Sequence, residues 1–192
     1  MMQKNRLLVT AVILALAQIV FLAWMIAGRA AILRDGQEVL LKVEPVDPRD
    51  LLRGDYVRLG YEISTIPVNL VTNAGSEVPA PDTIFVRVKK EADGFWRPVS
   101  ASLGAPSIAA LGEGEVEIRG TTSTGWVTRE NASIRVEYGV ERFYLPEGEG
   151  KPIERDMRIR SFGILAAVGK DGTAQIKALI DGDKVLFAEP LY

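Results

Sequence analysis

The stretch Gly54-Asp55-Tyr56-Val57-Arg58-Leu59-Gly60-Tyr61 combines a turn with the beginning of a strand. Glycine adopts the positive φ of a tight turn, and the carboxylate of a following aspartate accepts hydrogen bonds from the turn amides. After the turn, apolar and polar side chains alternate as far as Ile63, and a period of two is typical of a β-strand with one buried face. This stretch therefore predicts a β-rich domain.

Similar alternation recurs on both sides of this stretch. We expect strands over residues 39–44, 84–89, 115–121, 133–138 and 158–168. Gly163 falls inside the last of these, where a bulge or bend is expected. Short helices are expected over residues 47–52 and 106–111, and Pro106 suits a first helical turn.

Aspartate-glycine pairs mark the turns between several of these strands. They occur at residues 93–94, 171–172 and 181–182. Such pairs favour tight hairpins, so we expect the C-terminal part of the chain to be a three-stranded antiparallel meander. The predicted fold class is mainly β, as an antiparallel sandwich or a partly open barrel.

A run of 21 uncharged residues, Leu7–Ala27, precedes the predicted strands. As a helix it would be about 31 Å long, close to the ~30 Å thickness of the hydrocarbon core of a membrane. Lys4 and Arg6 also suit a cleaved signal peptide, for which Gly28-Arg29-Ala30 is the best cleavage candidate. The apolar cores of signal peptides are shorter, about 7 to 15 residues, so a retained anchor is the favoured interpretation.

The chain is expected to divide around this run. We predict a cytoplasmic N-terminus over residues 1–6, a transmembrane helix over 7–27, a stalk over 28–38 and an extracytoplasmic domain over 39–192. The positive-inside bias is modest, but the short segment before the helix cannot form a domain. This organisation predicts a single-pass protein of the cytoplasmic membrane, with its domain in the periplasm or on the outer face of the cell.

The amino-acid composition excludes several classes of function. The chain has no cysteine and no histidine, which removes disulfides, thiol nucleophiles, imidazole bases and most zinc sites. Lysine and arginine are interleaved with aspartate and glutamate, without the basic face that nucleic acid requires. We therefore expect no nucleic-acid partner, no cofactor, no metal and no catalytic residues.

The opening stretch places glycine, aspartate and tyrosine at 54–56, leucine at 59 and tyrosine at 61. This spacing resembles the motif that gives the GDYXXLXY protein family its name, a group of bacterial proteins with one N-terminal membrane segment and a domain of uncharacterised function. A second segment, residues 138–148, is also similar to that family. The resemblance implies membrane attachment, an extracytoplasmic domain and a neighbouring multi-pass membrane protein, and it supplies no reaction.

The role of the motif residues is open between two interpretations. On a regular strand Tyr56 points to one face while Leu59 and Tyr61 point to the other, so they line one pocket only if the backbone bulges. In the first interpretation the motif shapes the fold through Gly54, Asp55, Tyr56, Leu59 and Tyr61. In the second these residues form a binding site with the second segment, through Tyr138, Glu141, Arg142 and Tyr144.

Charged residues near both segments allow either outcome. Arg53, Asp55, Arg58, Arg135 and Glu137 can form an ion network with the second segment, although most such clusters are solvated faces. A concave polar pocket joining the two segments would favour a binding site. A motif buried on both faces, without a cavity, would favour a scaffold.

One enzyme class is similar in sequence at this point. Residues 50–57 resemble the turn that follows the nucleophile of membrane-anchored signal peptidases. Where those enzymes carry serine followed by methionine, this chain has Val46-Asp47-Pro48-Arg49. The nucleophile is missing, so a serine-lysine mechanism has nothing to activate.

The favoured hypothesis is a non-enzymatic interaction or accessory module that docks onto a multi-pass membrane protein or an envelope component. Phe95, Trp96 and Trp126 are candidate exposed aromatic anchors for that interface. The alternative is a small-molecule- or ion-binding protein, or a carboxylate-based hydrolase, that uses the charged residues around both segments.

Overall fold

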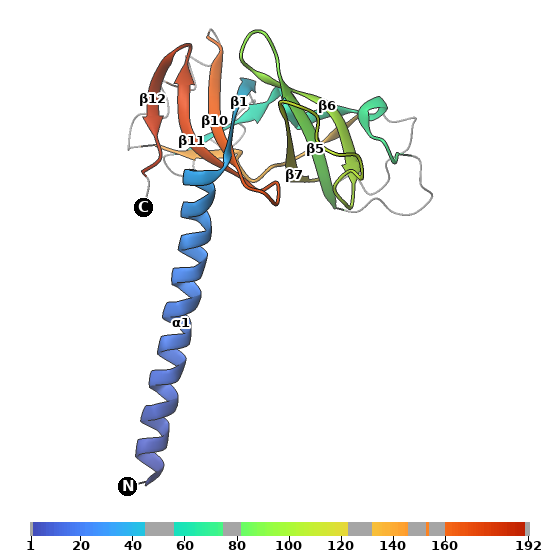
Figure 1. Cartoon of the computed structure of the whole chain (residues 1–192). Coiled ribbons are helices and arrows are strands. Elements are labelled where there is room, and N and C mark those ends of the chain that lie inside the picture. The colour runs from blue at the N-terminus through green and yellow to red at the C-terminus, as the bar shows by residue number, and fades with distance from the viewer. Residues whose placement is uncertain are drawn as a thin grey trace.

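The computed structural model describes residues 2–44, 56–74, 82–122, 132–145, 153 and 160–190. In it, one long helix carries a β-rich domain (Figure 1). The elements are α1 (Met2–Asp35), β1 (Gln37–Glu44), β2 (Tyr56–Arg58), β3 (Gly60–Tyr61), η1 (Glu62–Ser64), β4 (Thr65–Pro67), η2 (Val68–Leu70), β5 (Thr83–Lys90), β6 (Trp96–Leu103), β7 (Glu115–Thr121), β8 (Ser133–Arg135), β9 (Arg142–Tyr144), β10 (Phe162–Val168), β11 (Ala174–Asp181) and β12 (Lys184–Ala188).

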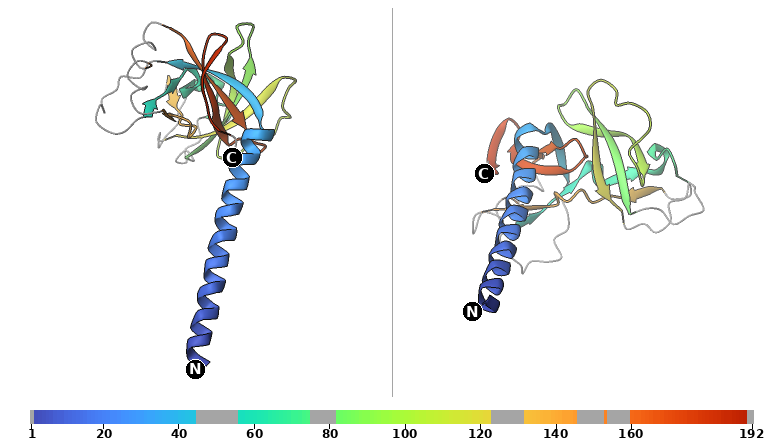
Figure 2. Two further views of the ribbon diagram at one scale, coloured as in Figure 1. Left: turned by 90° about the vertical axis from the view of Figure 1, so that its left-hand side faces the viewer. Right: turned by 60° about the horizontal axis from the view of Figure 1, so that its bottom comes forward.

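Helix α1 projects from beneath the domain, and most of the strands lie to one side of the helix axis (Figure 2). The helix does not end where the apolar run ends. It continues through most of residues 28–38 to Asp35, and Gly36 alone separates it from β1. A Cβ atom on Gly36 would lie 2.4 Å from the Ile32 carbonyl oxygen and 3.0 Å from that of Val168, so only glycine fits this junction.

The junction fixes the helix against the domain. Leu33 is buried, at 4% exposure, and the Gly36 amide donates to the Ile32 carbonyl at 2.9 Å. Apolar burial at the last turn, together with a one-residue link, leaves little freedom between α1 and the strands. The direction of the helix is therefore set by the domain.

The strands form two main sheets. The first has the order β12-β11-β10-β1-β3 and the second has the order β6-β5-β7, with antiparallel pairing throughout. Two short two-stranded ribbons, β2-β9 and β4-β8, each pair segments that are distant in the sequence. One buried cluster joins side chains from both sheets and both ribbons.

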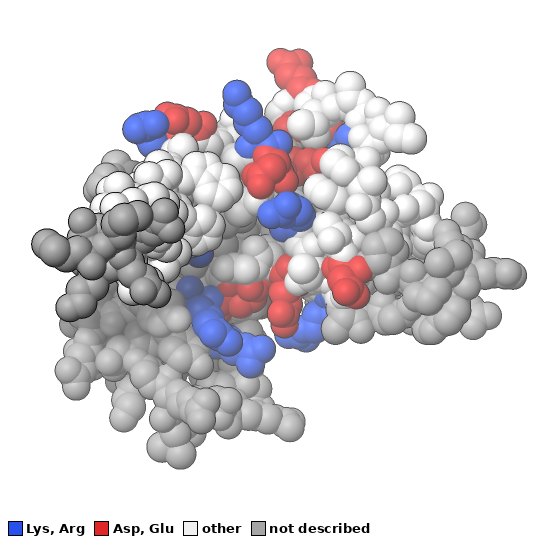
Figure 3. Space-filling model, turned by 90° about the horizontal axis from the view of Figure 1, so that it is seen from below, with Lys and Arg blue, Asp and Glu red and all other residues white. Residues whose placement is uncertain are grey.

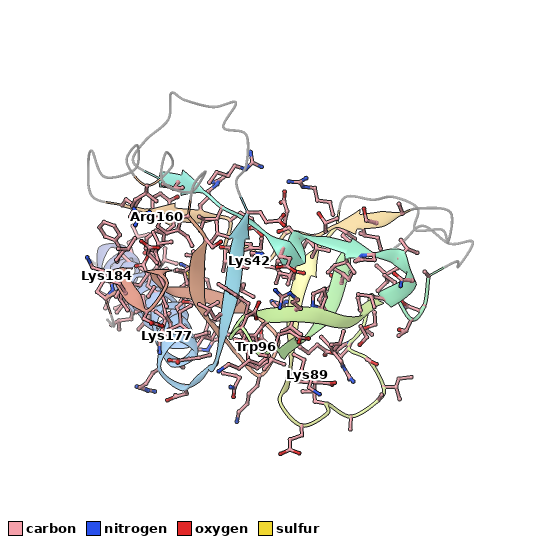
Figure 4. All side chains as sticks on the ribbon, turned by 90° about the horizontal axis from the view of Figure 1, so that it is seen from above. Lys42, Lys89, Trp96, Arg160, Lys177 and Lys184 are labelled. Carbon is pink, nitrogen blue, oxygen red and sulfur yellow. The ribbon has the colours of Figure 1, made fainter. Side chains whose placement is uncertain are left out.

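These observations confirm the predicted fold class. Among the described residues, 46% lie in strands and 25% in helix, and they include no closed barrel. The C-terminal meander is present as β10-β11-β12, and the Asp93-Gly94 hairpin joins β5 to β6 with Gly94 at a φ of 87°. The sheets meet at β1 and β6, where Figure 4 labels Lys42 and Trp96.

The expected bulge at Gly163 is wrong. Gly163 pairs regularly with Lys42 on one side and Ile180 on the other, and the register shift of β10 falls between Leu165 and Ala166. A Cβ atom on Gly163 would lie 2.9 Å from Leu40 Cδ1. The glycine is needed for close packing across the sheet face, which is the other common use of glycine in a strand.

The predicted helix over residues 106–111 is also wrong, because the carbonyl groups of this segment accept hydrogen bonds from a buried arginine. The Arg87 guanidinium donates to the carbonyls of Ala110 at 3.0 Å, Ser107 at 3.3 Å and Ala109, and it pairs with the Glu117 carboxylate at 3.1 Å. These carbonyls therefore do not face the amides of a following helical turn. The predicted helix over residues 47–52 lies outside the described residues.

Candidate functional site

The first segment (residues 54–61) and the second segment (residues 138–148) lie side by side where the structure describes them. Strands β2 and β9 pair antiparallel, with Tyr56 opposite Tyr144 and Arg58 opposite Arg142. The Leu59 amide then donates to the Glu141 carbonyl at 2.8 Å. The fold therefore brings together the two segments that carry the family resemblance.

Two tyrosines exchange hydrogen bonds across the pair of segments. The Tyr61 hydroxyl donates to the Val140 carbonyl at 2.5 Å, and the Tyr138 hydroxyl donates to the Ile63 carbonyl at 2.7 Å. Both rings are buried, at 1% and 5% exposure. Tyr61 thus satisfies a backbone carbonyl of the second segment, and Tyr138 satisfies one in η1, directly after the first segment, as buried carbonyls require.

Glu141 holds the turn of the second segment from inside. Its side chain accepts from the Tyr138 amide at 2.5 Å, across a turn in which Gly139 has a φ of 80°. Burial raises the pKa of both Tyr61 and Tyr138 well above 10.0, and the charge of Glu141 raises it further. Both phenols therefore stay protonated and act as hydrogen-bond donors, not as acids.

The other motif residues have different surroundings. Leu59 is buried at 2% exposure, whereas the Tyr144 ring is exposed at 67%. Tyr56 contributes its backbone to β2. Gly54 and Asp55 lie outside the described residues. Of the residues expected to form an ion network, Arg53 and Asp55 lie outside the described residues, and no ion pair joins Arg58, Glu137 and Glu141 to one another in the part that the structure describes. The functional role of the motif stays a prediction.

A groove of about 750 Å³ lies beside the two segments, on the side of α1. We define the charged groove by its lining residues, Arg29, Leu33, Arg58, Glu137, Gly139, Val140, Glu141, Arg142, Tyr144, Ala174, Gln175, Ile176 and Glu189. Arginines and glutamates lie together in it, so neither sign dominates. Figure 3, seen from below, shows both signs of charge around the hollow beside the helix.

A second, less polar pocket of about 500 Å³ continues from the charged groove down the side of the helix. Met25, Gly28, Arg29 and Ile32 of α1 form one wall, and Tyr138, Gly139 and Gln175 are among the residues of the other. The domain therefore overhangs one face of α1. Arg29, Gly139 and Gln175 line both hollows.

Three polar residues of the charged groove were not among the site residues expected from the sequence. Arg29 lies on α1, Gln175 on β11, and Glu189 directly after β12. Only the position of Arg29 is marked in the sequence, since it is the first charge after the apolar run. Gln175 and Glu189 are placed in the groove by the folding of the meander, which no pattern in the neighbouring sequence predicts.

Of the three expected aromatic anchors, the two that the structure describes do not form an exposed patch. Trp96 is buried at 7% exposure, and Phe95 is half-buried, with its ring near Gly163. Trp126 lies outside the described residues. Within the described ranges, no three carboxylates gather in a way that could hold a metal ion.

Comparison with known proteins gives one match. A family model described as GDYXXLXY protein matches residues 18–179. No curated protein and no solved structure matches the chain. The matched region includes the second half of α1, both segments and most of the meander.

Proposed function

Because the chain belongs to the GDYXXLXY protein family, whose domain is of uncharacterised function, we propose that it is a membrane-anchored, extracytoplasmic module that docks onto a neighbouring membrane protein. The charged groove beside α1 is the docking site in this proposal. It is the observation that carries the proposal, since it lies where the domain faces the membrane that the helix would span.

Anchoring by α1 is supported by its length and its exposure. The helix is long and apolar enough to cross a membrane, and none of its apolar window is buried against the domain. A signal sequence passes the same test, but α1 runs without a break into the domain and buries Leu33 there. Because the last turns of α1 are part of the folded domain, we expect the helix to be retained as an anchor and not cleaved.

Docking in the groove is supported by its chemistry. Arginine and glutamate side chains from the first segment, the second segment and α1 share one concave surface, and Tyr144 exposes its ring there. Mixed charge with arginine and tyrosine is typical of protein interfaces, where complementary charges select the partner. Attachment to the membrane also raises the local concentration of any partner in the same plane.

Site-specific photo-crosslinking in intact membranes tests this proposal. A photoreactive residue replaces Gln175, in the wall of the groove, and in a matched variant it replaces Val185 on β12, which is 54% exposed and does not line the groove. We expect the Gln175 position to capture one integral membrane protein that the Val185 position does not capture. Equal capture by both positions, or capture by neither, would contradict the proposal.

The same groove favours a second candidate function. A hollow of about 750 Å³ with both signs of charge, next to both segments, suits a small zwitterionic molecule. This is the ligand-binding alternative from the sequence. It predicts that the Gln175 position captures no protein, while a small zwitterionic ligand raises the melting temperature of the full chain.

A further inference from the structure

We propose that α1 forms part of the docking site, and that the helix face around Gln18 packs against a transmembrane helix of the partner. That partner helix carries a hydrogen-bonding side chain at the middle of the bilayer. This inference rests on the proposed anchoring and docking, and it names which part of the partner is bound.

The side chain of Gln18 needs a hydrogen-bond partner within the membrane. It lies next to the centre of the uncharged run Leu7–Ala27, and its exposed carboxamide makes no hydrogen bond within the described part of the chain. About ten residues separate it from either end of the run, or roughly 15 Å, which is too far for the side chain to reach water. An amide in hydrocarbon is costly unless it is hydrogen-bonded, so a second helix is the expected source of the bond.

The face around Gln18 is suited to close helix packing. At roughly 100° per residue, Ala11, Ala15 and Leu22 lie on one flank of Gln18 and Leu14, Phe21 and Met25 on the other, all within about 60° of it around the helix axis. Small side chains such as alanine allow two helix backbones to approach closely in a membrane. Val20 and Leu16 lie on the opposite face.

This face leads directly to the groove. Met25, Arg29 and Ile32 continue the same side of the helix, within about 40° of Gln18. They line the pocket whose other wall includes Tyr138 and Gln175. A helix packed against Gln18 would therefore meet the overhanging domain at its upper end, and the polar segment that follows it would enter the charged groove.

A second copy of this chain does not fit the same face. In a symmetric dimer of parallel helices each domain would overhang the other helix, because the pocket that includes Tyr138 and Gln175 stands over this face. Both domains would then occupy the space above the helix pair. The occupant must instead be a helix that ends near the level of Met25, as the helix of a multi-pass protein with a short external loop does.

The chemistry of the occupant follows from that of Gln18. A carboxamide both donates and accepts, so serine, threonine, asparagine, glutamine or histidine can pair with it. The position must lie at the middle of the bilayer, level with Gln18. The partner is thus an integral membrane protein with one such residue halfway along a helix.

Photo-crosslinking from the helix tests the inference in intact membranes of cells that make the full chain. The photoreactive residue replaces Leu22 on the Gln18 face, and Val20 on the opposite face serves as the matched control. We expect the Leu22 position to capture the same membrane protein as the Gln175 position, through a peptide of a transmembrane segment. The Val20 position should capture only lipid.

A substitution at Gln18 identifies the hydrogen bond. Gln18→Leu should lower the yield of the Leu22 product by about three- to twentyfold, whereas Gln18→Asn, which keeps a carboxamide, should retain most of it. Gln18 contacts none of the described domain, so both variants should fold and insert like the parent. An unchanged yield with Gln18→Leu would overturn the inference.

The remaining outcomes separate this inference from the proposed function. If Leu22 captures a second copy of the chain, or only lipid, while Gln175 still captures a membrane protein, the helix inference is overturned and groove docking stands. If neither position captures a protein, both are overturned. Release of the chain from membranes by alkaline carbonate would overturn the anchoring and the helix inference together.

Discussion

The Tyr61 hydroxyl lies 2.5 Å from the Val140 carbonyl oxygen, a hydrogen bond between residues 79 positions apart. Tyr138, close to Val140, returns a hydroxyl bond to Ile63, close to Tyr61. Because both bonds are buried and reciprocal, the two segments form one structural unit. This unit forms one side of the charged groove, and its two buried hydroxyls are already hydrogen-bonded within the unit.

Replacing either tyrosine by phenylalanine should destabilise the domain. Tyr61→Phe or Tyr138→Phe keeps the ring but leaves a buried carbonyl without its donor, at a cost of about 1 to 3 kcal/mol in the free energy of unfolding. Chemical denaturation of the full chain in detergent measures this change. Tyr144→Phe, at an exposed ring, should change the free energy by less than about 0.5 kcal/mol.

The same tyrosines predict a loss of stability in alkali. Their pKa values in the folded chain are raised well above the usual 10.0, chiefly by burial. Well below pH 10 the phenols are neutral in both the folded and the unfolded chain, so their contribution to the free energy of unfolding is fully present. Above pH 10 the unfolded chain loses these protons first, and the free energy of unfolding falls as the pH rises towards the folded pKa values.

Denaturation of the full chain between pH 8 and pH 12 checks this sign. The double variant Tyr61→Phe/Tyr138→Phe should start from a lower stability and lose less of it across the alkaline range. A parent protein whose stability does not fall more steeply than that of the double variant would show that the phenols are not buried as described.

The buried Arg87–Glu117 pair should be the costliest polar interaction to break. Arg87→Met leaves the largely buried Glu117 carboxylate with the Ser107 amide alone and leaves the carbonyls of residues 107, 109 and 110 without this donor, at a cost of about 3 to 5 kcal/mol in the free energy of unfolding. Arg87→Met/Glu117→Leu removes both charges and should recover much of that loss. Arg97→Ala, at a partly exposed arginine, should cost no more than about 1 kcal/mol.

Hydrogen exchange of the full chain would locate this effect. Relative to the parent, Arg87→Met should speed up exchange at the amides of residues 104–114 more than at those of β10 and β11. An equal increase in exchange rate across the whole domain would mean that the arginine supports the core and not the loop.

Gly120 is expected to tolerate no side chain. A Cβ atom there would lie 2.5 Å from Val136 Cγ1 and 3.0 Å from the Glu137 carbonyl oxygen, where β7 meets the segment after β8. Gly120→Ala should therefore cost about 1 to 3 kcal/mol through overpacking. The control is Gly28→Ala in α1, where nothing lies within 4 Å of the added atom; a similar loss in both variants would contradict the packing argument.

Sequence periodicity predicts burial well in this chain but not strand partners. Val57, Leu59, Tyr61 and Ile63 are all buried, as their alternation indicates. The expected single strand is nevertheless divided at Leu59, because β2 pairs with β9 whereas β3 pairs with β1. Alternation reports which face is buried, and pairing depends on segments far away in the sequence.

The features that local pattern could not predict all depend on distant residues. The loop over residues 106–111 is shaped by hydrogen bonds from Arg87, at least 19 positions earlier. The segment is therefore not helical, although its composition suits a helix. The charged groove takes Arg29, Arg58, Glu141, Gln175 and Glu189 from five separate parts of the chain. No spacing along the sequence records such a surface, although each of its two motif segments could be recognised alone.

The central claim is that the motif unit shapes the domain while the adjoining groove binds the partner. Its most direct test compares Tyr61→Phe with Arg58→Glu, which reverses a charge at an exposed position in the groove, by measuring melting temperature and Gln175 photo-crosslinking yield together. We predict that Tyr61→Phe lowers the melting temperature and, below that temperature, keeps the crosslink. Arg58→Glu should keep the melting temperature and lower the crosslink by about tenfold. Loss of the crosslink in a folded Tyr61→Phe protein, with full yield from Arg58→Glu, would contradict the account.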